Sequence, residues 1–70
     1  MDSYCVNRNA QSNGDHEVHN VTKNCAYLPD WSNRQDLGLH QNCTTAVQKA
    51  KQYFARSNGC YHCATACHTT

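Results

Sequence analysis

Apolar and polar residues alternate in two short segments near the start of the chain. In residues 3–10 apolar side chains stand at nearly every second position, and residues 16–22 repeat this alternation less regularly. A period of two is typical of a half-buried strand. Between the segments lies Asn13-Gly14, a dipeptide that favours a tight hairpin turn because both residues tolerate positive φ. The pattern predicts an N-terminal β-hairpin.

The second half of the chain carries a helical period instead. From Thr44 or Thr45 to about Arg56, apolar residues recur on one stripe, while polar residues take the opposite face. The stripe consists of Ala46, Val47, Ala50, Tyr53 and Phe54. Asn42 or Thr44 suits the N-cap, and residues 57–59, Ser-Asn-Gly, suit a helix end. One amphipathic helix is therefore predicted.

The remaining segments are less regular. Residues 24–36 contain Pro29 and other turn formers, which indicate a loop, and residues 37–40 are compatible with a short third strand. Ten residues rich in cysteine end the chain in a turn, with one helical turn expected at residues 64–67. The predicted fold class is α+β, in a single small domain of residues 1–70. The expected core members are Val6, Val18, Val21, Leu28, Trp31, Leu37, Leu39, Val47, Tyr53 and Phe54.

Length and composition make this core thin. The chain has 70 residues, of which 39% are hydrophobic. A domain of this size buries only about 60% of the surface of its unfolded chain, so small scaffolds usually need disulfides or a metal ion. Six cysteines and five histidines are present to supply one or the other.

The C-terminal cysteines have the spacing of metal ligands. Cys60 and Cys63 form a C-x2-C pair, and Cys67 follows with His68 beside it. Zn²⁺ prefers four thiolate or imidazole ligands in a tetrahedron. The predicted helix returns the chain from the region of Cys25 to this cluster. The expected ligands of a structural Zn²⁺ are Cys25, Cys60, Cys63 and Cys67, with His19, Cys43 and His68 as alternative fourth ligands.

Other uses of the cysteines remain open. Six cysteines also allow three disulfides, in 15 pairings. A redox-active C-x2-C pair is less favoured because it belongs at a helix N-terminus, whereas here the helix comes before it. An iron–sulfur centre would need a longer cysteine run. A catalytic cysteine needs a base and a substrate pocket, for which so short a chain has little room, so the protein is not expected to be an enzyme.

Charge is nearly balanced overall but uneven along the chain. The formal net charge is +1, and every acidic residue lies at or before Asp36. Lys49, Lys51 and Arg56 fall on or near the predicted helix and form a candidate basic face for nucleic acid. No apolar run is long enough to span a membrane, and the N-terminus lacks the features of a signal peptide. These features predict a cytoplasmic monomer that does not enter a membrane.

Several segments together resemble a group of small bacterial proteins that are rich in Cys and His and whose function is uncharacterised. They are residues 6–19 (VNRNAQSNGDHEVH), 25–29 (CAYLP), 58–63 (NGCYHC) and 67–69 (CHT). More distantly, His19, Cys25, a helix and then Cys60-x2-Cys63 are similar to the zinc-binding module of the Ada DNA-repair protein. That module uses four cysteines, of which Cys25, Cys60 and Cys63 have counterparts here. The similarity implies a zinc module with DNA contact, and it does not extend to methyl transfer.

The sequence thus favours a small non-catalytic zinc-binding module that mediates interaction with a protein or a nucleic acid. A secreted, disulfide-stapled peptide with a toxin-like or signalling role is the alternative. The two differ in the state of the thiols, because a metal site needs them reduced and a disulfide scaffold needs them oxidised.

Overall fold

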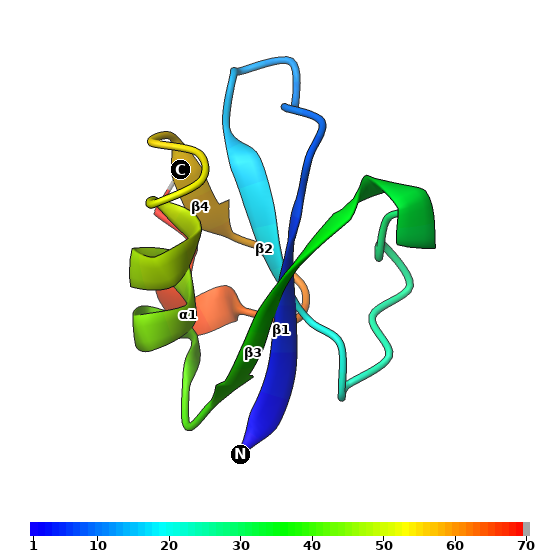
Figure 1. Cartoon of the computed structure of the whole chain (residues 1–70), viewed down its shortest axis with the longest axis vertical. Coiled ribbons are helices and arrows are strands. Elements are labelled where there is room, and N and C mark those ends of the chain that lie inside the picture. Colours follow the sequence, from blue (N-terminus) through cyan, green and yellow to red (C-terminus); the bar gives the residue numbers. More distant parts are fainter. Residues whose placement is uncertain (70) are drawn as a thin grey trace.

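The chain folds into a four-stranded mixed sheet that packs against one helix (Figure 1). This computed structural model describes residues 1–69. The strands are β1 (Asp2–Asn7), β2 (His16–Asn20), β3 (Arg34–His40) and β4 (Ser57–Gly59), and the helix is α1 (Cys43–Ala50). Two 3-10 turns, η1 (Trp31–Asn33) and η2 (Thr65–Cys67), lie in the connections. The predicted α+β class is confirmed.

Strands β1 and β2 form the predicted antiparallel hairpin, with Val6 opposite Val18. The sheet order is β3-β1-β2-β4. Strand β3 pairs antiparallel with β1 and is longer than the predicted third strand. A register shift opposite Tyr4 and Cys5 leaves Leu37 as an extra residue, and this bulge directs the Leu37 side chain into the core, where it is fully buried.

Helix α1 is shorter than predicted. Asn42 caps it by accepting a hydrogen bond from the Thr44 backbone N–H at 3.0 Å, and the helix ends at Ala50. The chain beyond forms turns, which free Phe54 to stack on His16 with the ring centroids 4.0 Å apart. Tyr53 is thereby left 49% exposed.

The core lies between α1 and one face of the sheet. Val6, Val18 and Leu37 are fully buried there against Ala46 and Ala50. The predicted core membership is wrong for three large residues that are exposed, namely Trp31, Leu39 and Tyr53. Trp31 does not cover the core from its loop, because its ring lies beneath the guanidinium of Arg34, 4.1 Å from the ring centroid.

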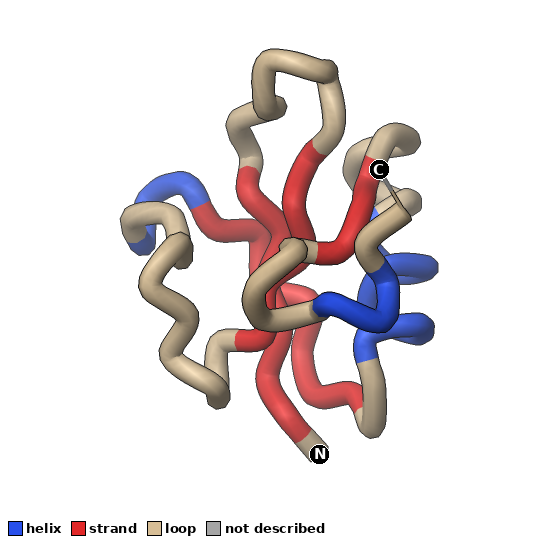
Figure 2. Tube along the Cα trace, turned by 180° about the vertical axis from the view of Figure 1, so that it is seen from behind, coloured by secondary structure: helices blue, strands red, loops and turns tan. Residues whose placement is uncertain are grey.

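Strand β4 was not predicted, and it decides where the C-terminal cysteines lie. It pairs parallel with β2, placing Ser57 opposite His16 and Gly59 opposite Val18. The pairing extends one step further, because the Cys60 N–H donates to the Val18 carbonyl at 2.9 Å. Figure 2 shows β4 at the edge of the sheet with η2 beside it. The cysteine-rich turn therefore begins next to the end of β2.

Candidate metal centre

Four side chains from three separate segments converge at the edge of β2. They are His19 from β2, Cys25 from the loop after β2, and Cys60 and Cys63 from the turn after β4. Their candidate ligand atoms all lie within 4.8 Å of one another. These residues form a Cys3His group suited to a metal ion.

Each segment is brought to this point by backbone structure. Pairing of β2 with β1 sets Cys5 opposite His19, so both side chains project from the same face of the sheet. The Leu28 N–H donates to the Cys25 carbonyl at 3.2 Å, and the Ala64 N–H donates to the Cys60 carbonyl at 2.9 Å. Two tight turns thus present Cys25 and the Cys60–Cys63 pair toward the His19 ring.

Two of the distances between candidate ligand atoms are close to those expected in a tetrahedral metal site. With Zn–S bonds of about 2.3 Å and Zn–N bonds of about 2.0 Å, neighbouring ligand atoms are separated by about 3.8 Å for two sulfurs and about 3.5 Å for sulfur and nitrogen. The Cys25 and Cys60 sulfurs are 4.0 Å apart. The Cys63 sulfur lies 3.6 Å from Nδ1 of His19. Nδ1 is therefore the nitrogen placed to act as a ligand.

Backbone N–H groups surround the three sulfurs. The N–H of Asn20 donates to Cys63 Sγ at 3.3 Å. The N–H of Tyr27 donates to Cys25 Sγ, and that of His62 donates to Cys60 Sγ, both at 3.4 Å. Hydrogen bonds of this kind favour the charged form of an acceptor, so each sulfur has a fixed donor that stabilises a thiolate.

Burial opposes negative charge at the same place. Cys60 and Cys63 are buried, and Cys25 is half-buried. Desolvation is the main cause that raises the pKa of the Cys63 thiol, and the neighbouring Cys25 and Cys60 raise it further, while the Asn20 N–H lowers it. Three clustered thiolates would repel one another unless a cation lay between them, and a divalent metal ion could supply that cation.

His19 is kept neutral, as a metal ligand must be. Its side chain is fully buried. Burial, with a smaller contribution from the positive charge of Arg34, lowers its pKa to about 4. Nε2, the other ring nitrogen, is buried and has no hydrogen-bond partner. The nearest carboxylate oxygen of Glu17 is 3.9 Å from it, too far for a hydrogen bond but close enough to orient the N–H by its charge.

The fourth predicted ligand, Cys67, lies outside this group. It is bonded to Cys43 in a disulfide with the two Cα atoms 6.1 Å apart, which also removes Cys43 from the alternative ligands. Turn η2 carries Cys67 away from Cys63 toward the start of α1, where Cys43 lies. His68 is also not in the group, and its Nδ1 lies 3.0 Å from the Gly59 carbonyl oxygen. The fourth candidate ligand that the structure brings together with the three cysteines is His19.

The remaining cysteine and the basic residues have other surroundings. Cys5 is free and 2% exposed, and burial raises its pKa to about 11, so it is a small buried apolar residue. Arg56 lies beyond the end of α1 and pairs with Asp15 at 3.3 Å. Its guanidinium also donates to the Asn13 carbonyl at 2.7 Å. The predicted basic face stays a prediction, since Lys49, Lys51 and the ion-paired Arg56 are all exposed.

Comparisons of the chain with protein-family models, with curated proteins and with solved structures find no match. The predicted resemblances to a bacterial Cys/His-rich group and to the Ada zinc module therefore stay predictions. No helix in residues 1–69 is long and apolar enough to cross a membrane. The evidence for function lies in the geometry of the Cys3His group.

Proposed function

We propose that the protein is a non-catalytic module whose fold is stabilised by one Zn²⁺ ion bound to His19, Cys25, Cys60 and Cys63. The observation that carries this proposal is the approach of four ligand atoms to within 4.8 Å of one another. Thiolate and imidazole donors in a tetrahedron suit Zn²⁺ better than the hard cations, which prefer oxygen. A closed set of four protein ligands is typical of structural rather than catalytic zinc.

Native mass spectrometry of protein purified without added metal tests the ligand set. The wild-type protein is expected to carry one zinc ion. His19→Ala and Cys25→Ala are expected to lose it, because each variant lacks one of the four proposed ligands. Cys5→Ala is the matched control, because Cys5 is a buried free cysteine outside the group, and it should keep its zinc. Unchanged zinc content in Cys25→Ala would show that the ligand assignment is wrong.

The Cys43–Cys67 disulfide should contribute to stability without contributing to metal binding. It closes a loop of 24 residues, for which chain entropy gives about 3.5 kcal/mol of stabilisation. We expect Cys43→Ala/Cys67→Ala to lower the free energy of unfolding of the zinc-loaded protein by this amount in a urea titration. Zinc stoichiometry should stay at one ion for each chain. Loss of zinc from the double variant would instead place Cys67 at the metal.

The disulfide also favours a second candidate function. Disulfides persist mainly in oxidising compartments, so a secreted peptide with a toxin-like or signalling role remains the alternative, and the cytoplasmic location stays a prediction. The two functions predict different masses for the protein. The zinc module is expected to lose two hydrogens at the one disulfide and to carry one metal, whereas a fully oxidised peptide would lose six hydrogens and carry none.

An interaction role is the natural use of so small a non-catalytic domain, and we propose a protein or small-molecule partner ahead of a nucleic acid. Nucleic-acid binders present clustered basic side chains. Of the three candidates here, Arg56 is already paired with Asp15, and only the two lysines stay unpaired on the surface. Monomeric state is part of this proposal.

A further inference from the structure

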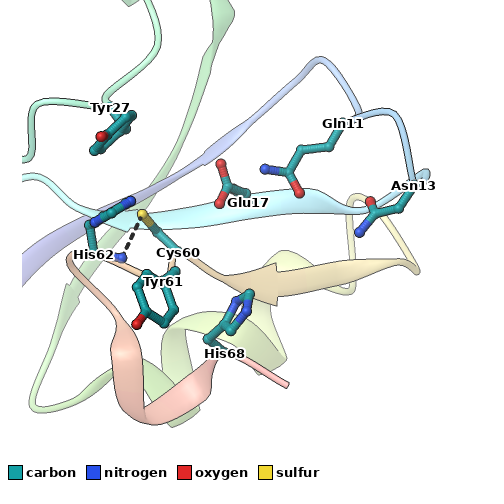
Figure 3. Close-up of a pocket in the computed structure, with 8 residues that line it drawn as sticks. All are labelled: Gln11, Asn13, Glu17, Tyr27, Cys60, Tyr61, His62 and His68. Carbon is teal, nitrogen blue, oxygen red and sulfur yellow. Dashed lines mark hydrogen bonds between the residues drawn. The ribbon is translucent and has the colours of Figure 1, made fainter. Parts of the chain in front are cut away.

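A depression of about 410 Å³ lies directly beside the Cys3His group. Figure 3 shows Glu17 and Gln11 on one side of it, Tyr61 and His68 on the other, and the Cys60 sulfur between them. Cys60 is thus shared by the metal group and the depression. We call this depression the Cys60 pocket. Its lining residues are Gln11, Asn13, Glu17, Tyr27, Cys60, Tyr61, His62 and His68.

The charge of the Cys60 pocket is negative. Glu17 contributes a carboxylate that is 20% exposed, and the described residues that line the pocket include no lysine or arginine. Three thiolates, one neutral imidazole and Zn²⁺ carry about one net negative charge. Because the Cys60 sulfur lines the pocket, part of this charge lies at the pocket wall. Anionic ligands such as phosphates are therefore disfavoured here.

Aromatic rings form the rest of the wall. Tyr27 stacks on His62 with centroids 4.2 Å apart, and Tyr61 contacts His62 and His68 edge to face at 5.1 Å and 5.4 Å. These contacts hold the rings in place although Tyr27 and Tyr61 are each 60% exposed. The face of an aromatic ring attracts cations through its quadrupole.

We propose that the Cys60 pocket binds an organic cation, an alkylammonium or guanidinium group, between the Glu17 carboxylate and the tyrosine rings. This inference rests on the proposed function, because the zinc-thiolate centre supplies part of the negative charge. The cation has two sources with the same chemistry, namely a free amine or the Lys or Arg side chain of a partner protein. Metal site and pocket then form one unit, in which the zinc holds the turn that carries Tyr61 and His62.

The test is an NMR titration of zinc-loaded, ¹⁵N-labelled protein with choline as the probe. Its control is 3,3-dimethyl-1-butanol, a neutral molecule of the same shape. Choline is expected to shift the amide signals of Glu17, Tyr27, Tyr61 and His62 and to bind about tenfold more tightly than the neutral molecule. Equal affinity for the two molecules, or shifts elsewhere only, would overturn the proposal.

Variants test whether choline binding depends on the charge and the aromatic ring of the pocket. We expect Glu17→Gln and Tyr61→Leu each to weaken choline binding about threefold to tenfold, while Asp30→Asn, which removes one exposed acid outside the pocket, leaves it unchanged. Equal loss in Glu17→Gln and Asp30→Asn would mean a non-specific charge effect and would refute the pocket.

The same samples show which source of cation binds more tightly and whether the protein carries zinc. Tighter binding of the peptide Ala-Lys-Ala than of choline supports a partner's side chain, and the reverse order supports a free amine. Zinc content is measured alongside by mass spectrometry. If the zinc-loaded protein does not bind choline, the proposal for the Cys60 pocket is refuted and the proposed function is not. If the purified protein carries no zinc, the proposed function is refuted.

Discussion

Removal of zinc is expected to unfold most of the domain. Structural zinc contributes on the order of 10–16 kcal/mol in small peptides, as much as or more than the roughly 5–15 kcal/mol of net stability of a typical domain. The core here offers little to offset that loss, since within residues 1–69 only Val6, Val18 and Leu37 are fully buried aliphatic residues larger than alanine. If the proposed zinc is removed, the sulfurs and the His19 ring lose the cation that would hold them together.

The measurement is circular dichroism and a two-dimensional NMR spectrum before and after a large excess of EDTA. We expect dispersed amide signals to collapse and to return when Zn²⁺ is restored, and Mg²⁺ should not restore them because it prefers oxygen ligands. The disulfide stays closed in both states, so the change reports on the metal alone. A dispersed spectrum in EDTA, with zinc shown to be absent, would contradict a structural role.

Low pH is expected to release the metal from the same site, as chelation does. Zinc binding requires deprotonated thiols and a neutral imidazole, and protons compete for each of the four ligands. Burial of His19 also lowers the free energy of unfolding at low pH, because its pKa of about 4 in the folded state lies below the ordinary value of about 6.5. That part of the stability is present above pH 6.5 and is lost as the pH falls toward 4.

The hairpin and the candidate ligands Cys60 and Cys63 could be predicted because both depend on local patterns, and Cys25 was added because the predicted helix returns the chain to it. Alternation and Asn13-Gly14 specify the hairpin, and C-x2-C specifies half of the metal group. Strand β4 was missed because Ser57, Asn58 and Gly59 have no apolar side chain. Their burial comes from pairing with β2, which no local pattern reveals.

The identity of the fourth candidate ligand could not be predicted, because it depends on strand β4. Sequence proximity to Cys63 favoured Cys67, but parallel pairing of β4 with β2 brings Cys60 beside Val18 and hence next to His19. The spacing of His19 to Cys25 was the one available signal, and it pointed to a ligand without ranking it first. Trp31 was misplaced because apolar character alone does not show whether a ring packs in the core or against a cation such as Arg34. Tyr53 was misplaced because α1 ends at Ala50, before the predicted apolar stripe is complete.

Gly59→Ala is expected to disrupt the metal site from outside the ligand set. A Cβ atom at Gly59 would lie 2.7 Å from the Ala64 carbonyl oxygen and 2.8 Å from both the carbonyl carbon and Cβ of Cys67. Two of these atoms belong to the backbone, so the turn between β4 and η2 must move, and Cys60 and Cys63 lie within it. Overpacking of this kind costs about 1–3 kcal/mol or more.

Gly38→Ala supplies the matched control for this substitution. Gly38 lies in β3 with φ of +80° and has no atom within 4 Å of the added Cβ, so alanine there meets only the left-handed backbone strain of about 1–2 kcal/mol. Both variants should lower the urea midpoint of the zinc-loaded protein. Competition with a chromophoric chelator should show zinc affinity reduced about tenfold or more in Gly59→Ala, since each 1.4 kcal/mol is tenfold, and unchanged in Gly38→Ala. Equal zinc affinity in the two variants would mean that the turn can shift without moving Cys60 and Cys63, and that close packing at Gly59 does not set the metal site.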